Sequence, residues 1–102
     1  MKYQTFAALV ELIKRYKSHD EKKDTVVICS LSTLSDLRSK CVKALFDMRD
    51  SNIEYFYGAR IMLDNKGSSY LAVAYADKLS GEITDLTEIT EEAADNGSKD
   101  TF

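Results

Sequence analysis

The residues that could take part in chemistry are few and lie mainly around one apolar segment, TVVICSL at positions 25–31. Cys29 lies just before a predicted helix, whose N-terminus can lower the pKa of a thiol and make it a nucleophile. The single histidine, His19, stands in the charged segment before it. A structural zinc ion needs about four ligands, and His19 is far in sequence from Cys41. The pattern therefore predicts no metal site, no catalytic residue and no cofactor.

Four hydroxyl side chains follow Cys29 at this helix start: Ser30, Ser32, Thr33 and Ser35. A helix N-terminus can bind an anion, but the segment lacks the glycine and lysine of a phosphate-binding loop. Helix capping explains these hydroxyls. Cys29 is accordingly interpreted as a buried thiol that packs as a small apolar residue, and both cysteines are expected to be free.

Hydrophobic periodicity predicts two helices and a buried strand in the first half of the chain. Apolar residues recur at three- and four-residue steps over residues 3–16, which indicates an amphipathic helix. Residues 25–31 form a continuous, largely β-branched run, typical of a strand buried on both faces. A second helix is predicted from about Leu34 to Arg49, with a capping box formed by Thr33 and Asp36 at its start.

The second half predicts a hairpin of residues 53–63 with residues 68–79 through the turn DNKG at positions 64–67. Alternation then divides the paired residues between two faces. The core face pairs Tyr57 with Tyr75, Ala59 with Val73, and Ile61 with Leu71. The other face pairs Phe56 with Ala76, Gly58 with Ala74, Arg60 with Ala72, and Met62 with Tyr70. Small residues dominate this second face, which is either covered by the first helix or exposed as a semi-apolar partner surface.

Residues 81–86 are predicted to form a short strand, and residues 87–95 a frayed helix capped by Thr87. The fold class is α/β or α+β, in the order α-β-α-β-β-β: a small mixed sheet with two helices and a frayed acidic C-terminal segment. Residues 1–90 are predicted to be a single globular domain. Residues 91–102 are predicted to be an acidic, polar and flexible tail.

Charge is distributed unevenly in this acidic chain, whose net charge is −3. Residues 1–75 carry twelve Lys or Arg and nine Asp or Glu, whereas residues 76–102 carry two and eight. No apolar run approaches the roughly 18 residues that a membrane span needs, and no signal-peptide pattern is present. A cytoplasmic protein without a membrane partner is predicted. Direct nucleic-acid binding is left open but not favoured, because the second face of the hairpin has one arginine.

These observations favour a non-enzymatic protein-binding module, a small adaptor or inhibitor of the kind that phages and mobile elements encode to act on host machinery. The alternative is an accessory subunit of a nucleic-acid-processing complex, and the third hypothesis is a small enzyme with Cys29 at a helix N-terminus. The partner is an unidentified protein, and a homodimer is also left open. The predicted partner-binding residues are Phe56, Arg60, Met62, Tyr70, Glu91 and Glu92.

Overall fold

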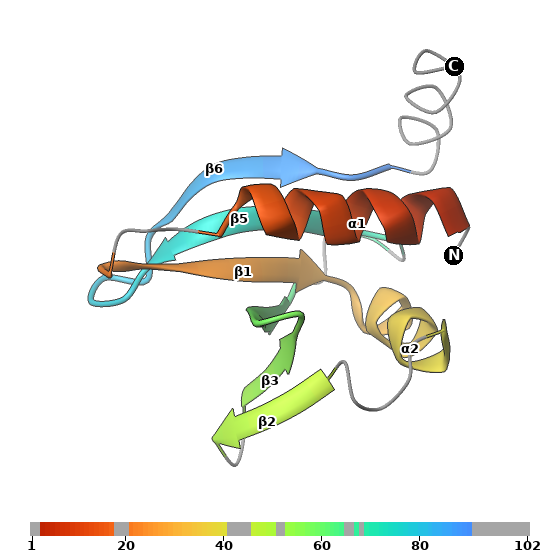
Figure 1. Ribbon diagram of the computed structural model, residues 1–102, viewed down its shortest axis with the longest axis horizontal. Coiled ribbons are helices and arrows are strands. Elements are labelled where there is room, and N and C mark those ends of the chain that lie inside the picture. The colour runs from red at the N-terminus through yellow and green to blue at the C-terminus, as the bar shows by residue number, and fades with distance from the viewer. Residues whose placement is uncertain are drawn as a thin grey trace.

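The computed structural model describes residues 3–17, 21–40, 46–50, 53–64, 67 and 69–90, without the side chains of residues 49 and 50. The helices are α1 (Tyr3–Arg15) and α2 (Leu31–Lys40); the strands are β1 (Lys23–Cys29), β2 (Phe46–Asp50), β3 (Ile53–Phe56), β4 (Ala59–Leu63), β5 (Leu71–Asp77) and β6 (Ile83–Glu88). In this part of the chain, two helices and a mixed sheet of six strands confirm the α+β class and the predicted order, with five strands following α2 (Figure 1).

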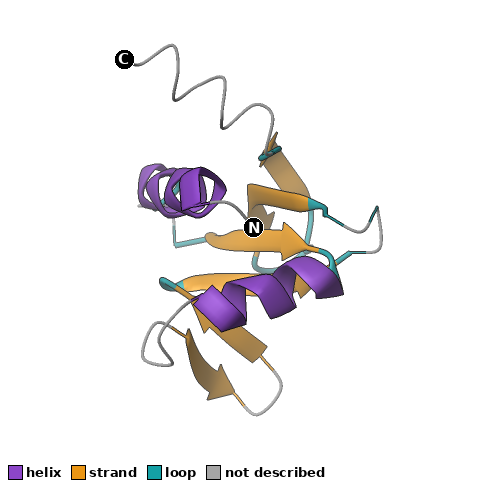
Figure 2. Ribbon diagram, turned by 90° about the vertical axis from the view of Figure 1, so that its right-hand side faces the viewer, coloured by secondary structure: helices purple, strands orange, loops and turns teal. Residues whose placement is uncertain are grey.

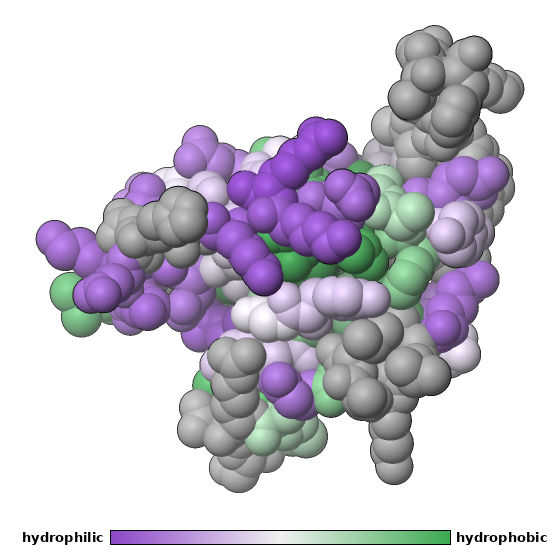
Figure 3. Space-filling model, in the orientation of Figure 1, coloured by the Kyte–Doolittle hydropathy of each residue, from purple (hydrophilic) through white to green (hydrophobic). Residues whose placement is uncertain are grey.

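Helix α1 agrees with the predicted segment and packs on one face of the sheet (Figure 2). Its apolar stripe buries Leu9 and Ile13, which are 0% and 2% exposed. Lys14 and Arg15 lie in the last turn, where cations complement the negative end of the helix dipole. Figure 3 shows this side of the molecule, with hydrophilic residues over α1 and an apolar area beneath them.

Helix α2 begins at Leu31 rather than at Leu34, because the cap is Ser30. The Leu34 amide donates to the Ser30 carbonyl at 3.0 Å, and the Thr33 amide donates to Ser30 Oγ at 3.4 Å. The Ser30 hydroxyl also lies 2.9 Å from that of Thr33. Capping therefore accounts for this serine, and the predicted box of Thr33 with Asp36 is wrong.

The predicted second helix is also too long, because residues 46–50 form strand β2. This strand pairs with β3, and the Phe46 ring lies 4.8 Å from the Phe56 ring. Pairing with a neighbouring strand and burial against an aromatic ring outweigh the weak helical preference of the segment. Residues 41–45, including Cys41, lie outside the described residues.

The predicted strand 53–63 is divided into β3 and β4 by a two-residue turn at Tyr57 and Gly58. Both residues have positive φ, 53° and 83°, and Phe56 pairs with Ala59 across the turn. Two successive positive φ values define a type I′ hairpin turn, which fits the twist of the flanking strands. The dipeptide Tyr-Gly therefore ends one strand where alternation alone predicts its continuation.

The strand order in the sheet is β2-β3-β4-β1-β5-β6, so β1 separates the two strands that were predicted to pair as a hairpin. Val27 of β1 pairs with Ile61 of the parallel strand β4 and with Val73 of the antiparallel strand β5. The predicted register of the hairpin, including Tyr57 with Tyr75, is therefore wrong. The physical reason lies in β1 itself: its apolar residues alternate between two buried clusters, and such a strand belongs at the centre of a sheet.

The predicted division of residues between two faces is nevertheless largely confirmed. The first face carries Ala59, Leu71 and Val73, which pack with residues of both helices. Tyr75 also lies on this face, because its ring is 4.9 Å from the Tyr16 ring at the end of α1. Alternation along β4 and β5 survives the change of partner, since the side chains of a strand keep their period of two.

Strand β6 confirms the short strand near residues 81–86 and extends it to Glu88. Thr87 and Glu88 pair with Val73 and Ala72 of β5, so the predicted helix does not start at Thr87. Ile89 and Thr90 are not helical either, and the remaining residues of that predicted helix, like the rest of the tail 91–102, lie outside the described residues. Within the described ranges, no helix is long and apolar enough to cross a membrane.

Candidate functional site

The second face of the sheet carries an apolar layer to which neither described helix contributes. We call it the alanine face, after Ala72, Ala74 and Ala76 of β5. Its buried residues are Val26, Ile28, Ala72, Ala74 and Ala76. Leu9 and Ile13 of α1 and Leu34 and Leu37 of α2 all belong to the core of the opposite face. The question whether α1 covers the small residues is thus answered: it packs on the other side of the sheet.

The alanines are the floor of this face and not its surface. Ala72 and Ala74 are 0% exposed, so these small residues are not themselves an exposed surface, which was one of the two alternatives. The larger side chains of Met62, Tyr70 and Ile83 pack against the floor and remain partly exposed. These larger side chains, and not the alanines, are what a partner would contact.

Leu86 belongs to the same outer layer. The following residue fixes its orientation, because the Thr87 hydroxyl lies 2.6 Å from the Tyr16 hydroxyl on the helix side of the sheet. Alternation then directs Leu86 toward the alanine face, where 42% of it is exposed. Sequence reasoning missed Ile83 and Leu86. Alternation alone would place these two residues on opposite faces, and the β-bulge in β6, where Asp85 has a positive φ of 53°, brings them to the same one.

The structure brings together three of the predicted partner-binding residues. Arg60, Met62 and Tyr70 all lie on the alanine face, as predicted. Phe56 does not: it is fully buried on the helix side, where its ring lies 6.0 Å from that of Phe6 in α1. The turn at Tyr57 and Gly58 reverses the chain, so alternation cannot be carried from β4 back to Phe56. Glu91 and Glu92 lie outside the described residues.

Arg60 lies on β4, beside the buried residues of the alanine face. It pairs with Val26 on one side and with Tyr55 on the other, and directly paired residues point to the same face. Its Nη2 contacts the Met62 sulfur at 3.8 Å, a weak acceptor. Its Nε is closed to solvent and has no hydrogen-bond partner. A polar group buried without a partner costs about 1 to 3 kcal/mol.

Acidic residues of the same face do not neutralise Arg60. Asp47 is separated from it by Tyr55, and strands are spaced about 4.8 Å apart, so two strand spacings intervene. Asp24 pairs instead with Lys78, at 3.7 Å. Glu88 lies opposite Ala72 on the far edge strand. Among the residues that the structure describes, no carboxylate forms an ion pair with Arg60.

Arg38 provides a comparison within the same chain. It extends from α2 to Glu54 of β3, donating to Oε1 from Nε at 3.2 Å and to Oε2 from Nη2. This is a bidentate pair along the Nε and Nη2 edge of the guanidinium. The Glu54 carboxylate raises the pKa of Arg38. The same edge of Arg60 meets a single methionine sulfur.

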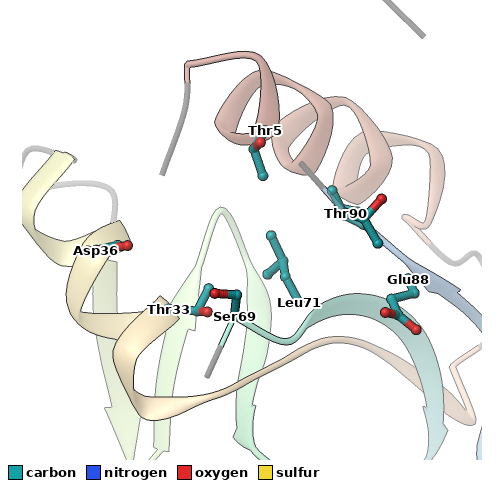
Figure 4. Close-up of a pocket in the computed structure, with 8 residues that line it drawn as sticks. Thr5, Thr33, Asp36, Ser69, Leu71, Glu88 and Thr90 are labelled. Atoms are coloured by element: carbon teal, nitrogen blue, oxygen red, sulfur yellow. The ribbon is translucent and has the colours of Figure 1, made fainter. Parts of the chain in front are cut away.

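A separate cavity of about 250 Å³ opens at the N-terminal ends of both helices (Figure 4). Its lining combines hydroxyls, two carboxylates and two apolar side chains: Thr5, Thr33, Asp36, Ser69, Leu71, Glu88, Ile89 and Thr90. Neither lysine nor arginine is among these described lining residues, and the carboxylates oppose an anion. Among these described residues there is also no histidine or cysteine that could act as base or nucleophile. The cavity therefore does not indicate a reaction.

Cys29 does not form a reactive site. Its side chain is fully buried, and burial raises the pKa of the thiol to about 11, although the charge of Arg38 acts in the opposite direction. A thiol in this state is neither exposed nor ionised near neutral pH. The interpretation of Cys29 as a small core residue is supported.

His19 lies outside the described residues, and among those described no group of three or more His, Cys, Asp or Glu is placed to hold a metal ion. Comparisons with protein-family models, with curated proteins and with solved structures give no significant match.

Proposed function

We propose that this chain is a non-enzymatic protein-binding module, a small adaptor or inhibitor whose contact surface is the outer layer of the alanine face. That layer consists of Arg60, Met62, Tyr70, Ile83 and Leu86. The observation that carries the proposal is the environment of Arg60: a guanidinium held over an apolar sheet face, with Nε closed to solvent and unpartnered.

Two further features support a protein partner. Both described helices pack on the opposite face, so within the described part of the chain no helix covers this apolar layer. Its composition, an arginine, an aromatic residue and a methionine among aliphatic side chains, matches the residue types enriched at the centre of protein interfaces.

Nucleic acid fits this face less well. A polyanion needs several cations, whereas Lys78 is already paired with Asp24 at 3.7 Å, and the strand pairing places Asp47 and Glu88 on the same face as Arg60. These acids would repel phosphates at either side of the arginine. A carboxylate-bearing protein segment needs one cation and an apolar surround.

The test is selection from a library of short random peptides displayed on yeast, followed by affinity measurements with the purified full chain. Wild-type protein should enrich peptides that bind with micromolar affinity. Leu86→Asp should abolish that binding, because a charge would enter the outer layer without disturbing the buried floor.

Leu79→Asp is the matched control. Leu79 is 98% exposed in the turn between β5 and β6, so the same change there alters net charge equally without touching the face. Peptides that bind the Leu86→Asp variant as tightly as the wild type, or a library that yields no binder at all, would contradict the proposed function.

A further inference from the structure

Resting on the proposed function, we infer that the partner presents an Asp or Glu side chain to the Nε and Nη2 edge of Arg60, within an otherwise apolar segment. The occupant of the alanine face is thus defined by chemistry: a protein segment with one carboxylate flanked by apolar residues. The carboxylate supplies acceptors that the described part of the chain does not provide to this arginine.

The first step of the argument is the geometry of a satisfied arginine in this protein. Arg38 meets Glu54 with Nε and Nη2 together, which is the preferred bidentate arrangement for a carboxylate. Arg60 presents the same two atoms on the other face of the sheet. Nε has no partner, and Nη2 has only the Met62 sulfur at 3.8 Å.

The second step concerns access to that edge. Nε is closed to solvent, so a partner must first displace whatever lies against it. Met62 contacts the guanidinium, and methionine is unbranched and flexible, which lets it change rotamer at low cost. A carboxylate that replaces the sulfur would exchange one weak acceptor for two strong ones.

The third step is charge complementarity. Tyr55, Val26 and Met62 surround Arg60, so an incoming carboxylate would be largely removed from water. Charge-assisted bonds are stronger in such surroundings than on an open surface. A further acid of the partner that lies over β6 would approach Glu88 and be repelled. A single acid among apolar residues is therefore the favoured pattern, rather than an acidic run.

A double-mutant cycle tests this directly, with the peptides enriched on the wild-type chain as probes. We expect these peptides to share one Asp or Glu, and its replacement by Asn or Gln should weaken binding about tenfold or more. Arg60→Met should weaken binding of the acidic peptide by a similar factor. The combination should cost no more than either change alone, because both remove the same contact.

Arg38→Met is the control variant, since it removes an arginine already paired within the chain, and it should leave peptide affinity unchanged. The Nε–H resonance of Arg60 should also shift when the acidic peptide is added, and not with its amide counterpart. Additive losses in the cycle, with binding still sensitive to Leu86→Asp, would overturn the carboxylate contact and leave the proposed function standing. Binding insensitive to Leu86→Asp would contradict the function itself. A third outcome is that the library yields no acidic peptides and that a single-stranded oligonucleotide binds in a salt series only when Arg60 is present. The group that Arg60 binds would then be a phosphate and not a carboxylate.

Discussion

Replacing Arg60 by methionine should stabilise the isolated protein. The substitution removes a guanidinium whose Nε is buried without a partner, and that burial costs about 1 to 3 kcal/mol. Methionine retains most of the length of the arginine stem, so packing over Val26 and beside Met62 is largely kept. Allowing for imperfect repacking, we expect a gain of about 1 kcal/mol. For a chain of 102 residues this corresponds to a rise in Tm of about 4 to 8 °C.

The assay is reversible thermal and urea unfolding of the full chain, followed by circular dichroism. Arg38→Met is again informative, because it breaks the pair with Glu54 and should lower the free energy of unfolding by about 0.5 to 1 kcal/mol. The two substitutions are chemically identical and should have opposite signs. A fall in Tm for Arg60→Met as large as that for Arg38→Met would refute the reasoning, since it would mean that the chain itself satisfies Arg60.

Three further predictions follow from the rest of the structure. Cys29 should resist alkylation in native protein at pH 8 and react at once in urea, because burial raises its pKa to about 11. Cys29→Ala should lower the free energy of unfolding by about 1 to 2 kcal/mol. Gly58→Ala should destabilise the protein by about 1 kcal/mol in urea unfolding, because φ is +83° there although open space surrounds a new Cβ. The amides of Ser80 and Leu79 donate to the Asp77 carboxylate and lower its pKa. Asp77 therefore stabilises the fold at pH values above the usual pKa near 3.8, and this contribution is lost as the pH falls through the lower pKa of the folded protein. Asp77→Asn should therefore lower the urea midpoint at pH 7, and an equal difference at pH 2 would contradict this assignment.

The sequence was sufficient to predict the elements whose burial is settled locally. The apolar stripe of α1 and the continuous apolar run of β1 each show which of their side chains are buried. Alternation placed Arg60 and Met62 on one face. These patterns depend on the period of a helix or strand, which does not change with the choice of neighbour.

What the sequence did not predict depends on contacts between distant segments. The segment of β2 was predicted to be helical because its apolar residues have helical spacing. Its pairing with β3 outweighs that preference and is not visible in the spacing. The position of β1 between β4 and β5 was missed because the turn residues between those two strands favour a direct hairpin. Phe56 was misplaced for a more local reason: positive φ at Tyr57 is uncommon outside glycine, so a turn there was not expected.

The candidate surface was predicted in part for the same reasons. Alternation identified Arg60, Met62 and Tyr70, but the burial of Ala72 and Ala74 beneath their neighbours required coordinates. The lack of a carboxylate beside Arg60 in the described residues could not be read from a chain with seventeen acids. Strand order decides which acids come near, and the pairing of β4 with β5 was one of the parts of the fold that sequence reasoning had wrong.

Arg38 and Arg60 have different proposed roles in this molecule, Arg38 in stability and Arg60 in recognition. The pair of Arg38 with Glu54 joins α2 to β3 and contributes to the fold whether or not a partner is present. Arg60 contributes little to the isolated fold, since its Nε meets no acceptor, and the same atom would gain an acceptor when a carboxylate docks. A substitution that improves the free protein and weakens the complex is expected of a binding residue held in an unfavourable state. An Arg60→Met variant that is both more stable and equally able to bind would leave the arginine without a role, and the contact surface would then have to be sought among Tyr70, Ile83 and Leu86 alone.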